Sequence, residues 1–285
     1  MSVTTPLTLD SAELSSWREV SGAALHHNVA TLRALAGTAK LGVVVKADAY
    51  GHGLAPVCSG LIDAGVDWLI VNFAHEATAV RAIVGPDLPV YVCGTVFPHD
   101  APALVDARAR VVLYDPLVAA SLSAASLARG VVMPVHLKIE TGTHRQGLTT
   151  SDALALATQV QALDGLTIEG VTTHFADIED STDHRFAHSQ LDALHEAQRA
   201  LAQSGIAVPM VHSANSAATI LDERTRGDLV RIGIAAYGLW PSKETLAAFR
   251  ERHGRQPPTL LPVLSWRARI AQVKDVPTGA YVGYG

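Results

Sequence analysis

Eight short apolar runs, many rich in β-branched residues, alternate with longer alanine- and leucine-rich segments, and this alternation constrains the fold more than any other feature of the chain. The runs have the length of buried strands, and the segments between them have helical spacing. Strands that alternate with helices pair in parallel, with the helices as crossovers. The predicted strands are 41–45, 68–71, 90–93, 111–113, 135–139, 167–172, 210–212 and 229–232, and the clearest helices between them are 74–83, 117–129, 151–162 and 183–204. Eight strands in this pattern predict an α/β fold, a closed (β/α)8 barrel over residues 23–240, and a doubly wound open sheet is the alternative.

The chain changes character after residue 240, where prolines become frequent. One helix is predicted at 242–252, followed by strands at 265–273 and 280–284. We therefore interpret 241–285 as a linker and the start of a β-rich second domain, with too few strands for an independent sheet, so that this domain is expected to be truncated. The N-terminal segment, 1–22, contains a further strand candidate at 16–22 that is predicted to pair with it, ahead of a helix at 23–35.

Composition excludes several classes of function. The 285 residues carry a formal net charge of −5, which provides no basic footprint for nucleic acid or for an anionic membrane. Cys58 and Cys93 form neither a disulfide framework nor a metal-ligand spacing, so we expect no metal and a reducing, cytoplasmic location. No N-terminal signal pattern is present, and no apolar run approaches the ~20 residues of a membrane span.

Polar side chains stand at the ends of the predicted strands. Lys46 directly follows a run of three valines. An unpaired ammonium is costly to bury, whereas a desolvated, neutral lysine amine can form a Schiff base with a carbonyl. The alternative is a lysine that reaches solvent from a strand end. The other polar residues of this kind are Lys138, His174, Asn215, Ser216 and Arg231. Since the active site of a barrel lies at the carboxyl ends of its strands, these residues are predicted to converge.

Two of these strand ends suggest a phosphate site. Ser216 offers a hydroxyl where a short helix is expected to begin, and Gly233 allows the backbone to approach an anion closely. A serine in this position also serves as a helix cap, which is the simpler interpretation. A phosphate site opposite a lysine amine fits a phosphorylated aldehyde, and pyridoxal 5'-phosphate is such a molecule.

At these residues the chain resembles the alanine racemase family, the barrel-type pyridoxal-phosphate enzymes. Five segments carry the resemblance in order: VKADAYGHG at 45–53, KIETGTHR at 138–145, THFA at 173–176, ANSA at 214–217 and VRIGIAAYG at 230–238. The resemblance implies an isomerase that interconverts L-alanine and D-alanine for peptidoglycan precursors, as a homodimer with shared active sites. It implies cofactor contacts from Lys46, Tyr50, His174, Asn215, Ser216, Arg231, Gly233 and Ile234.

The resemblance also implies catalytic roles. Lys46 would hold the cofactor covalently and exchange a proton on one face of the α-carbon, and Tyr284 of the partner subunit would act on the other face. Arg231 would hydrogen-bond the pyridine nitrogen and keep it unprotonated, because an arginine does not readily give up its proton. Arg145 would orient the substrate carboxylate or the cofactor's phenolic oxygen, and Lys138 behind it is a candidate for carbamylation.

The chain departs from the family pattern in two places. It ends one residue after Tyr284, which implies that the β domain is incomplete, and Thr143 stands where the family commonly has methionine. A racemase of broader specificity, a related decarboxylase and a catalytically weak protein that binds the cofactor are therefore alternatives. The acidic stretch at 177–180, followed by Asp183 and His184, resembles a metal site, but a loop that caps a helix is the simpler interpretation.

Overall fold

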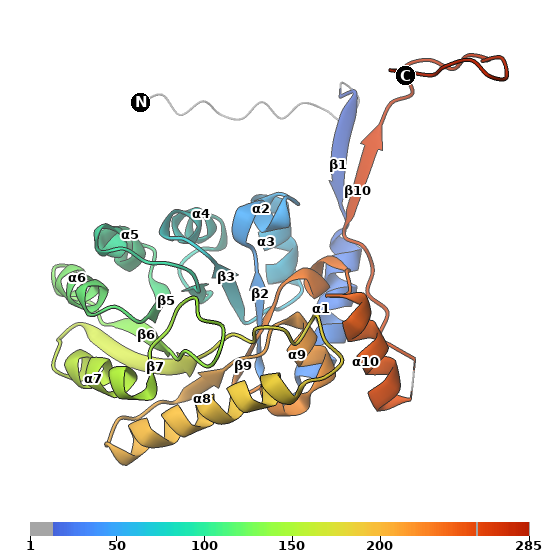
Figure 1. The fold of residues 1–285 in the computed structure, drawn as a ribbon. Coiled ribbons are helices and arrows are strands. Elements are labelled where there is room, and N and C mark those ends of the chain that lie inside the picture. The colour runs from blue at the N-terminus through green and yellow to red at the C-terminus, as the bar shows by residue number, and fades with distance from the viewer. Residues whose placement is uncertain (1–13, 255, 285) are drawn as a thin grey trace.

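The computed structural model describes residues 14–254 and 256–284 and contains a barrel of eight parallel strands (Figure 1). The strands are β2 (Lys40–Val44), β3 (Trp68–Val71), β4 (Val90–Val92), β5 (Ala109–Leu113), β6 (Met133–Lys138), β7 (Leu166–Thr172), β8 (Met210–His212) and β9 (Leu229–Ile232). They are ordered β8-β7-β6-β5-β4-β3-β2-β9. The ring closes between β8 and β9, where Asp228 N–H donates to the Val211 carbonyl at 2.8 Å and Arg231 N–H to the Ala214 carbonyl at 2.9 Å. All eight predicted strands are confirmed, and the open sheet is excluded.

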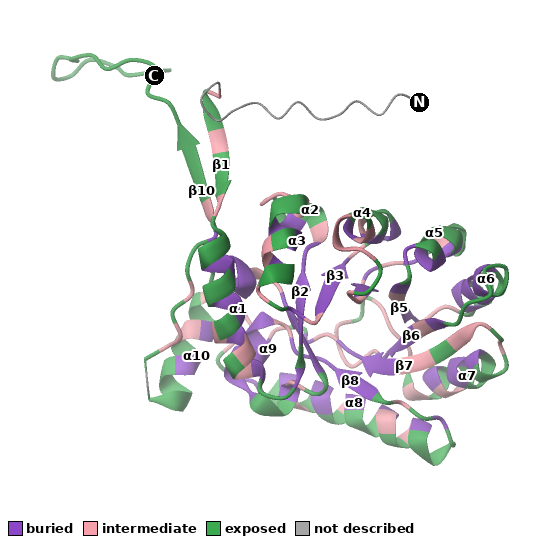
Figure 2. Ribbon diagram, turned by 180° about the vertical axis from the view of Figure 1, so that it is seen from behind, coloured by how far each residue is buried: buried purple, intermediate pink, exposed green. Residues whose placement is uncertain are grey.

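Helices cover the outside of the barrel, with their buried faces on the strands (Figure 2). The helical elements are α1 (Gly22–Ala36), α2 (Lys46–Tyr50), α3 (Leu54–Asp63), α4 (Ala74–Val84), α5 (Ala101–Asp106), α6 (Pro116–Leu127), α7 (Thr150–Gln161), α8 (Arg185–Gln203), α9 (Ser216–Leu221) and α10 (Lys243–His253), with 3-10 turns η2 (Pro98–Asp100), η3 (Glu223–Thr225) and η4 (Ile234–Tyr237). The short α2 differs from the others, because its backbone is left-handed after Lys46. The predicted helices are confirmed. The sequence did not indicate α3 or α5. Pro56 and Gly60 obscure the helical periodicity of α3, and the six residues of α5 are too few to show a periodicity. No helix in the described part of the chain combines the length and the apolarity that a membrane-spanning segment needs.

The barrel interior is packed by a second, smaller apolar cluster that includes Trp68, Ile70 and Tyr91. Alternate residues of each strand point inward, so β6 and β8 also direct His136 and His212 into this interior. Both imidazoles are fully buried. The interior is therefore partly polar, in contrast to the branched apolar layers that usually fill such barrels.

A two-stranded ribbon rises from the barrel (Figure 1). In it β1 (Ser16–Val20) pairs antiparallel with β10 (Leu264–Ala268), as predicted for the strand before residue 23. The predicted strand at 265–273 therefore ends early, and the prediction of a strand at 280–284 is wrong. Within the described residues no neighbouring strand offers backbone partners to 270–284, and a strand requires such partners. The domain boundaries themselves stay predictions.

Candidate active site

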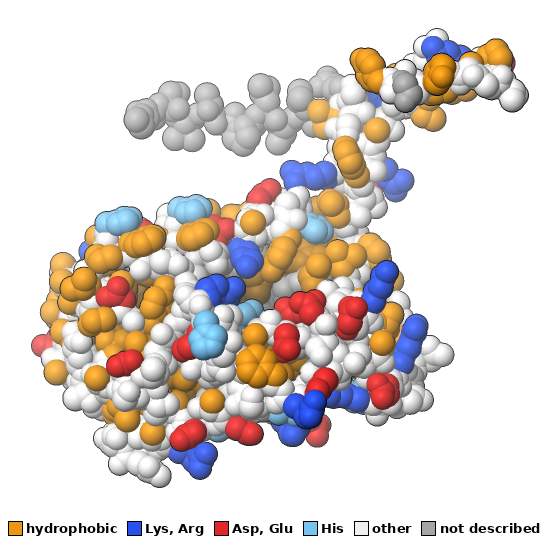
Figure 3. All heavy atoms as spheres, viewed as in Figure 1, with side chains coloured by type: hydrophobic (Ala, Val, Ile, Leu, Met, Phe, Trp, Pro, Cys, Tyr) orange, Lys and Arg blue, Asp and Glu red, His pale blue; other side chains and the backbone are white. Residues whose placement is uncertain are grey.

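A cavity of about 770 Å³ opens at the carboxyl ends of the strands, within the usual size of small-molecule sites. Figure 3 shows a hollow on this face, with basic side chains on one side of it and acidic side chains on the other. Ten of the predicted site residues line the cavity: Lys46, Tyr50, Lys138, Arg145, His174, Asn215, Ser216, Arg231, Gly233 and Ile234. The fold thus gathers residues that are up to 188 positions apart, from Lys46 to Ile234.

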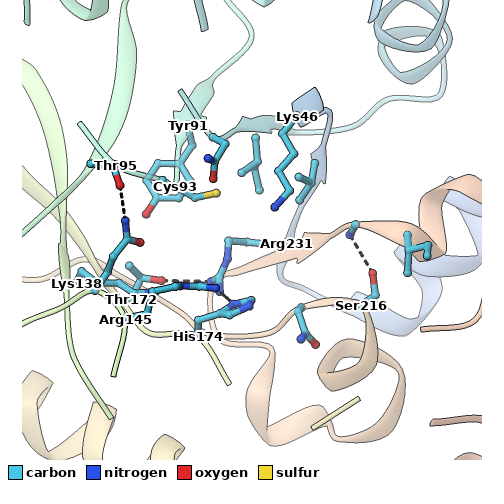
Figure 4. Close-up of a pocket in the computed structure, with 18 of the residues that line it drawn as sticks. Lys46, Tyr91, Cys93, Thr95, Lys138, Arg145, Thr172, His174, Ser216 and Arg231 are labelled. Atoms are coloured by element: carbon cyan, nitrogen blue, oxygen red, sulfur yellow. Dashed lines mark hydrogen bonds between the residues drawn. The ribbon is translucent and has the colours of Figure 1, made fainter. Parts of the chain in front are cut away.

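Lys46 follows β2, is half-buried, and extends its side chain into the cavity (Figure 4). The four residues after it, 47–50, form a left-handed turn with φ between 52° and 55°. This conformation costs roughly 1–2 kcal/mol per residue for L-amino acids. Two carboxylates hold the turn, because Glu76 accepts from Ala47 N–H at 2.6 Å and Asp48 accepts from Leu54 N–H at 2.7 Å. The turn brings Tyr50 back to the same cavity as Lys46.

Hydroxyl and amide groups converge at one end of the cavity. Gly233 N–H donates to Ser216 Oγ at 2.9 Å, and the Tyr50 hydroxyl lies so close that a Cβ on residue 233 would be 2.9 Å from it. Asn215 is the residue that caps α9, through a 2.9 Å bond from Ala218 N–H, so the simpler interpretation of Ser216 as a cap is wrong. Burial raises the pKa of Tyr50 to about 12, so its hydroxyl keeps a proton to donate. This end of the cavity has the donors that an anion needs.

Arg231 lies at the floor of the cavity on β9, and its guanidinium is fixed by neighbouring groups. It donates to the carbonyls of Thr173 at 2.9 Å and Ser213 at 3.0 Å, and to His212 Nδ1 at 2.8 Å. A longer contact of 3.5 Å reaches His174 Nδ1. Burial lowers the pKa of Arg231, yet arginine keeps its proton in proteins. The cavity therefore has a rigid cation at its base.

Further cationic and potentially cationic side chains surround that base. Lys138 is more than nine-tenths buried, and within the described residues its amine has no hydrogen-bond or ion-pair partner. Burial, followed by the charge on Arg231, lowers the pKa of Lys138 to about 7. Burial and the charges on Arg231 and Lys138 hold the pKa of His174 well below its usual range. Arg145 also lines the cavity, so this wall favours an anionic ligand.

Sequence reasoning missed several residues that also line the cavity. Gln146 donates to Thr95 Oγ1 at 2.9 Å and to the Tyr114 hydroxyl at 3.1 Å, which ties the loop after β6 to the ends of β4 and β5. Glu179 accepts from Asn215 Nδ2 at 2.9 Å. Cys93 directs its thiol toward the cavity (Figure 4). Gln146 and Glu179 lie in loops that follow predicted strands, and Cys93 is the last residue of one, so these positions were the available signal.

The structure also describes two other segments that the sequence analysis singled out. Among the described residues, which include the acidic stretch at 177–180, no group of three or more His, Cys, Asp or Glu side chains is placed to hold a metal ion. Tyr284 is fully exposed and does not line the cavity of its own chain. It belongs to the segment beyond β10, which extends away from the barrel (Figure 1). One chain alone therefore does not bring Tyr284 to Lys46.

Comparison with known proteins agrees with this geometry. The family model for the alanine racemase N-terminal domain matches residues 20–241. A curated alanine racemase from Desulfosudis oleivorans is 38% identical over 283 residues, which are 96% of this chain and 70% of that protein. The solved alanine racemase from Streptomyces coelicolor A3(2) is 33% identical with a TM-score of 0.85 over 96% of this chain and 71% of its own. That from Bacillus anthracis, solved with bound L-Ala-P, is 28% identical with a TM-score of 0.82 over 95% of this chain and 68% of its own.

The chain spans about 70% of the length of the curated relatives that it matches. The match includes the whole barrel and every segment that lines the cavity. The chain belongs to the alanine racemase family and is an enzyme of that family.

Proposed function

We propose that this chain interconverts L-alanine and D-alanine with pyridoxal 5'-phosphate as its cofactor. The observation that supports the proposal best is that three features share one cavity. Lys46 lies on one wall and Arg231 at the floor. The hydroxyls of Tyr50 and Ser216 and the amide of Gly233 form a cradle at one end. These three features match the aldehyde, the phosphate and the pyridine nitrogen of that cofactor. The family membership supports the same choice.

The residues fit the cofactor group by group. Tyr50, Ser216, Gly233 and Ile234 would hold the phosphate, and His174 and Asn215 would flank the bound molecule. Arg231 would donate a hydrogen bond to the pyridine nitrogen, and because it keeps its own proton it would leave that nitrogen unprotonated. The cofactor, when bound, supplies electron withdrawal from the bond between the α-carbon and its hydrogen. The close approach at Gly233 supports this fit, since any Cβ there would meet the Tyr50 hydroxyl.

Racemisation requires proton transfer on both faces of the α-carbon. Lys46 Nζ would remove or deliver the proton on one face. Tyr284 would do so on the other face from a second subunit, because it is exposed and remote from the cavity of its own chain. A two-fold symmetric homodimer with two shared sites follows from this exchange.

The cationic wall would bind the substrate carboxylate, with Arg145 as its main contact. The Lys138 amine, with a pKa of about 7, is partly neutral near neutral pH. A neutral amine can add to carbon dioxide, which forms an N–C bond, releases a proton and leaves a carbamate anion. Such an anion would supply the partner that the buried amine lacks and would hold Arg145 in place. We therefore propose Lys138 as a carbamylation site.

Exchange of the α-proton in deuterium oxide tests the two roles separately. In Tyr284→Phe, the enantiomer deprotonated by Lys46 should keep exchanging its α-proton, whereas exchange of the other enantiomer and racemisation should fall together. Tyr281→Phe is the matched control, because Tyr281 is also an exposed tyrosine of the same segment. Equal losses for both enantiomers in Tyr284→Phe would contradict the single-face role.

A weakly active protein that binds the cofactor is the second candidate, because Tyr284 is fully exposed and does not line the cavity that contains Lys46. The same experiment separates the two. If the chain exchanges the α-proton of one enantiomer but does not racemise, Lys46 acts on its face of the α-carbon and no group acts on the other face. A panel of amino acids in the racemisation assay decides whether specificity is broader than alanine. The cytoplasmic location stays a prediction.

A further inference from the structure

A chain of hydrogen bonds crosses the barrel interior and ends at Arg231. Arg110 Nε donates to Glu169 Oε2 at 2.8 Å, and the same oxygen lies 2.9 Å from His136 Nε2. His136 Nδ1 lies 2.9 Å from His212 Nε2, and His212 Nδ1 lies 2.8 Å from Arg231. Arg110 is the second residue of β5 and Glu169 is the middle residue of β7, whereas Arg231 lies beneath the cavity. We call this chain of five side chains, Arg110, Glu169, His136, His212 and Arg231, the relay. It links the barrel interior to the active-site end of the barrel.

The local backbone is shaped to allow these contacts. The register between β6 and β7 shifts, with Val135 opposite Ile168 and His136 opposite Gly170, so that Glu169 is the extra residue of a β-bulge. Bulges redirect side chains, and this one brings the Glu169 carboxylate to His136. A Cβ on residue 170 would lie 2.4 Å from His136 Nδ1, so a glycine is required where the two imidazoles meet.

Aromatic rings enclose the relay and keep its geometry. The Tyr91 ring centroid lies 5.0 Å from that of His136 and 5.4 Å from that of His212. Trp68 packs edge-on against His136, with 5.8 Å between the ring centroids, and the Arg110 guanidinium lies over the Trp68 ring, 4.8 Å from its centroid. Both imidazoles are fully buried. Neither ring has room to turn away from its partners.

The two ends of the relay fix where its protons lie. Arg231 can only donate, so His212 Nδ1 must be the bare nitrogen and His212 Nε2 must carry the proton. That proton is donated to His136 Nδ1, which leaves the His136 proton on Nε2, facing Glu169. The Glu169 carboxylate can only accept a hydrogen bond, so it also requires the His136 proton to be on Nε2. Burial lowers the pKa of both histidines, which keeps both imidazoles neutral.

Glu169 keeps its negative charge although its side chain is partly buried. Burial pushes the pKa of Glu169 upward, but the hydrogen bond from His136 and the charge on Arg110 outweigh it and leave the pKa below its usual range. The carboxylate is therefore ionised at neutral pH. An ionised acceptor makes a hydrogen bond about twice as strong as a neutral one, and it selects one tautomer of His136.

We propose that Glu169 is a positioning residue that fixes Arg231 beneath the cofactor through the tautomers of His136 and His212. The inference rests on the proposed function, because it gives Arg231 its role at the pyridine nitrogen. Without the carboxylate, both histidines can exchange their tautomers. His212 would then present an N–H to the Arg231 N–H, and the two donors would push the guanidinium away from its place.

The test compares Glu169→Gln, which keeps the shape and removes the charge, with Asp106→Asn. Asp106 is also ion-paired to an arginine, Arg129, but it is far more exposed and has no histidine partner. Nitrogen-15 NMR of the histidine-labelled, cofactor-free chain reports directly which imidazole nitrogen carries the proton, with His212 assigned from its loss in His212→Asn. We expect His212 of the wild-type chain and of Asp106→Asn to be protonated at Nε2, and Glu169→Gln to show a mixture of tautomers.

The second arm uses the cofactor-loaded chain. Loss of a charge-assisted bond predicts about a five- to tenfold lower kcat in Glu169→Gln with KM changed less than twofold. A wild-type His212 that is protonated at Nδ1 or at both nitrogens would overturn the proposal, even if the variant does not fold. Unchanged tautomers, or changed tautomers with unchanged kcat, would also overturn it. A wild-type chain that does not racemise alanine would instead refute the proposed function. The NMR experiment would still show whether Glu169 fixes the tautomer of His212.

Discussion

Replacement of Lys138 by methionine should stabilise the cofactor-free chain in a pH-dependent way. The ordinary lysine pKa of 10.5 falls to about 7 in the folded chain, chiefly because the amine is buried. At about 1.4 kcal/mol for each pH unit of this gap, the folded protein bears a cost of about 3–5 kcal/mol when the amine is charged. Lys138→Met removes that cost and retains a similar volume.

How the cost of burying the Lys138 amine changes with pH follows from the protons that the folded and unfolded states bind. Below pH 7 the amine is charged in the folded and the unfolded state, so the whole cost is present. Between pH 7 and 10.5 the unfolded chain binds the proton more strongly than the folded chain, and the wild-type free energy of unfolding rises with pH through this group. Above that range the amine is neutral in both states and the cost is gone.

Urea unfolding at several pH values, in buffers free of carbon dioxide, measures the effect. We expect Lys138→Met to exceed wild type by about 3–5 kcal/mol at pH 6 and by less than about 1 kcal/mol near pH 10. Lys243→Met, at an exposed lysine on α10, is the control and should differ little at any pH. A Lys138→Met difference that stays constant from pH 6 to pH 10 would refute the assignment of a charged, unpartnered amine.

Two further substitutions test the phosphate end and the attachment of the C-terminal segment. Gly233→Ala places a Cβ 2.9 Å from the Tyr50 hydroxyl and should weaken pyridoxal-phosphate binding at least tenfold in a fluorescence titration, whereas Gly22→Ala, with open space around it, should not. Equal affinities would show that the cradle is not where the cofactor binds. Asn28 is buried and exchanges two hydrogen bonds with the Leu261 backbone, both at 2.8 Å, so Asn28→Ala should lower the free energy of unfolding by about 2–4 kcal/mol in urea. A loss below about 1 kcal/mol would mean that 256–263 is held mainly by other contacts.

The barrel and most of the cavity could be predicted because their signals are local. The barrel strands are short and mainly apolar runs, and Lys46, His174 and Arg231 each stand at or near the end of such a run. The closed topology then brings these strand ends together. The structure adds the ring closure between β8 and β9, which the order of elements alone does not give.

The remaining features depend on contacts that the sequence does not display. The left-handed turn at 47–50 contains no glycine, and it is stabilised by Glu76, which is distant in sequence. The relay required a β-bulge at Glu169, and a one-residue bulge reverses the inward and outward pattern on which strand predictions depend. The strand predicted at 280–284 has suitable residues, but strand formation depends on a partner, and residue type alone does not supply one.

The central claim is that Lys46 holds pyridoxal 5'-phosphate in the barrel cavity. The most direct test is the visible absorption spectrum of the purified chain with the cofactor, followed by borohydride reduction and peptide mapping, with Lys46→Ala as the matched variant. We expect a yellow protein whose reduced cofactor is attached to the peptide that contains Lys46, and a variant without this attachment. No absorption band, or a cofactor attached to another lysine, would contradict it.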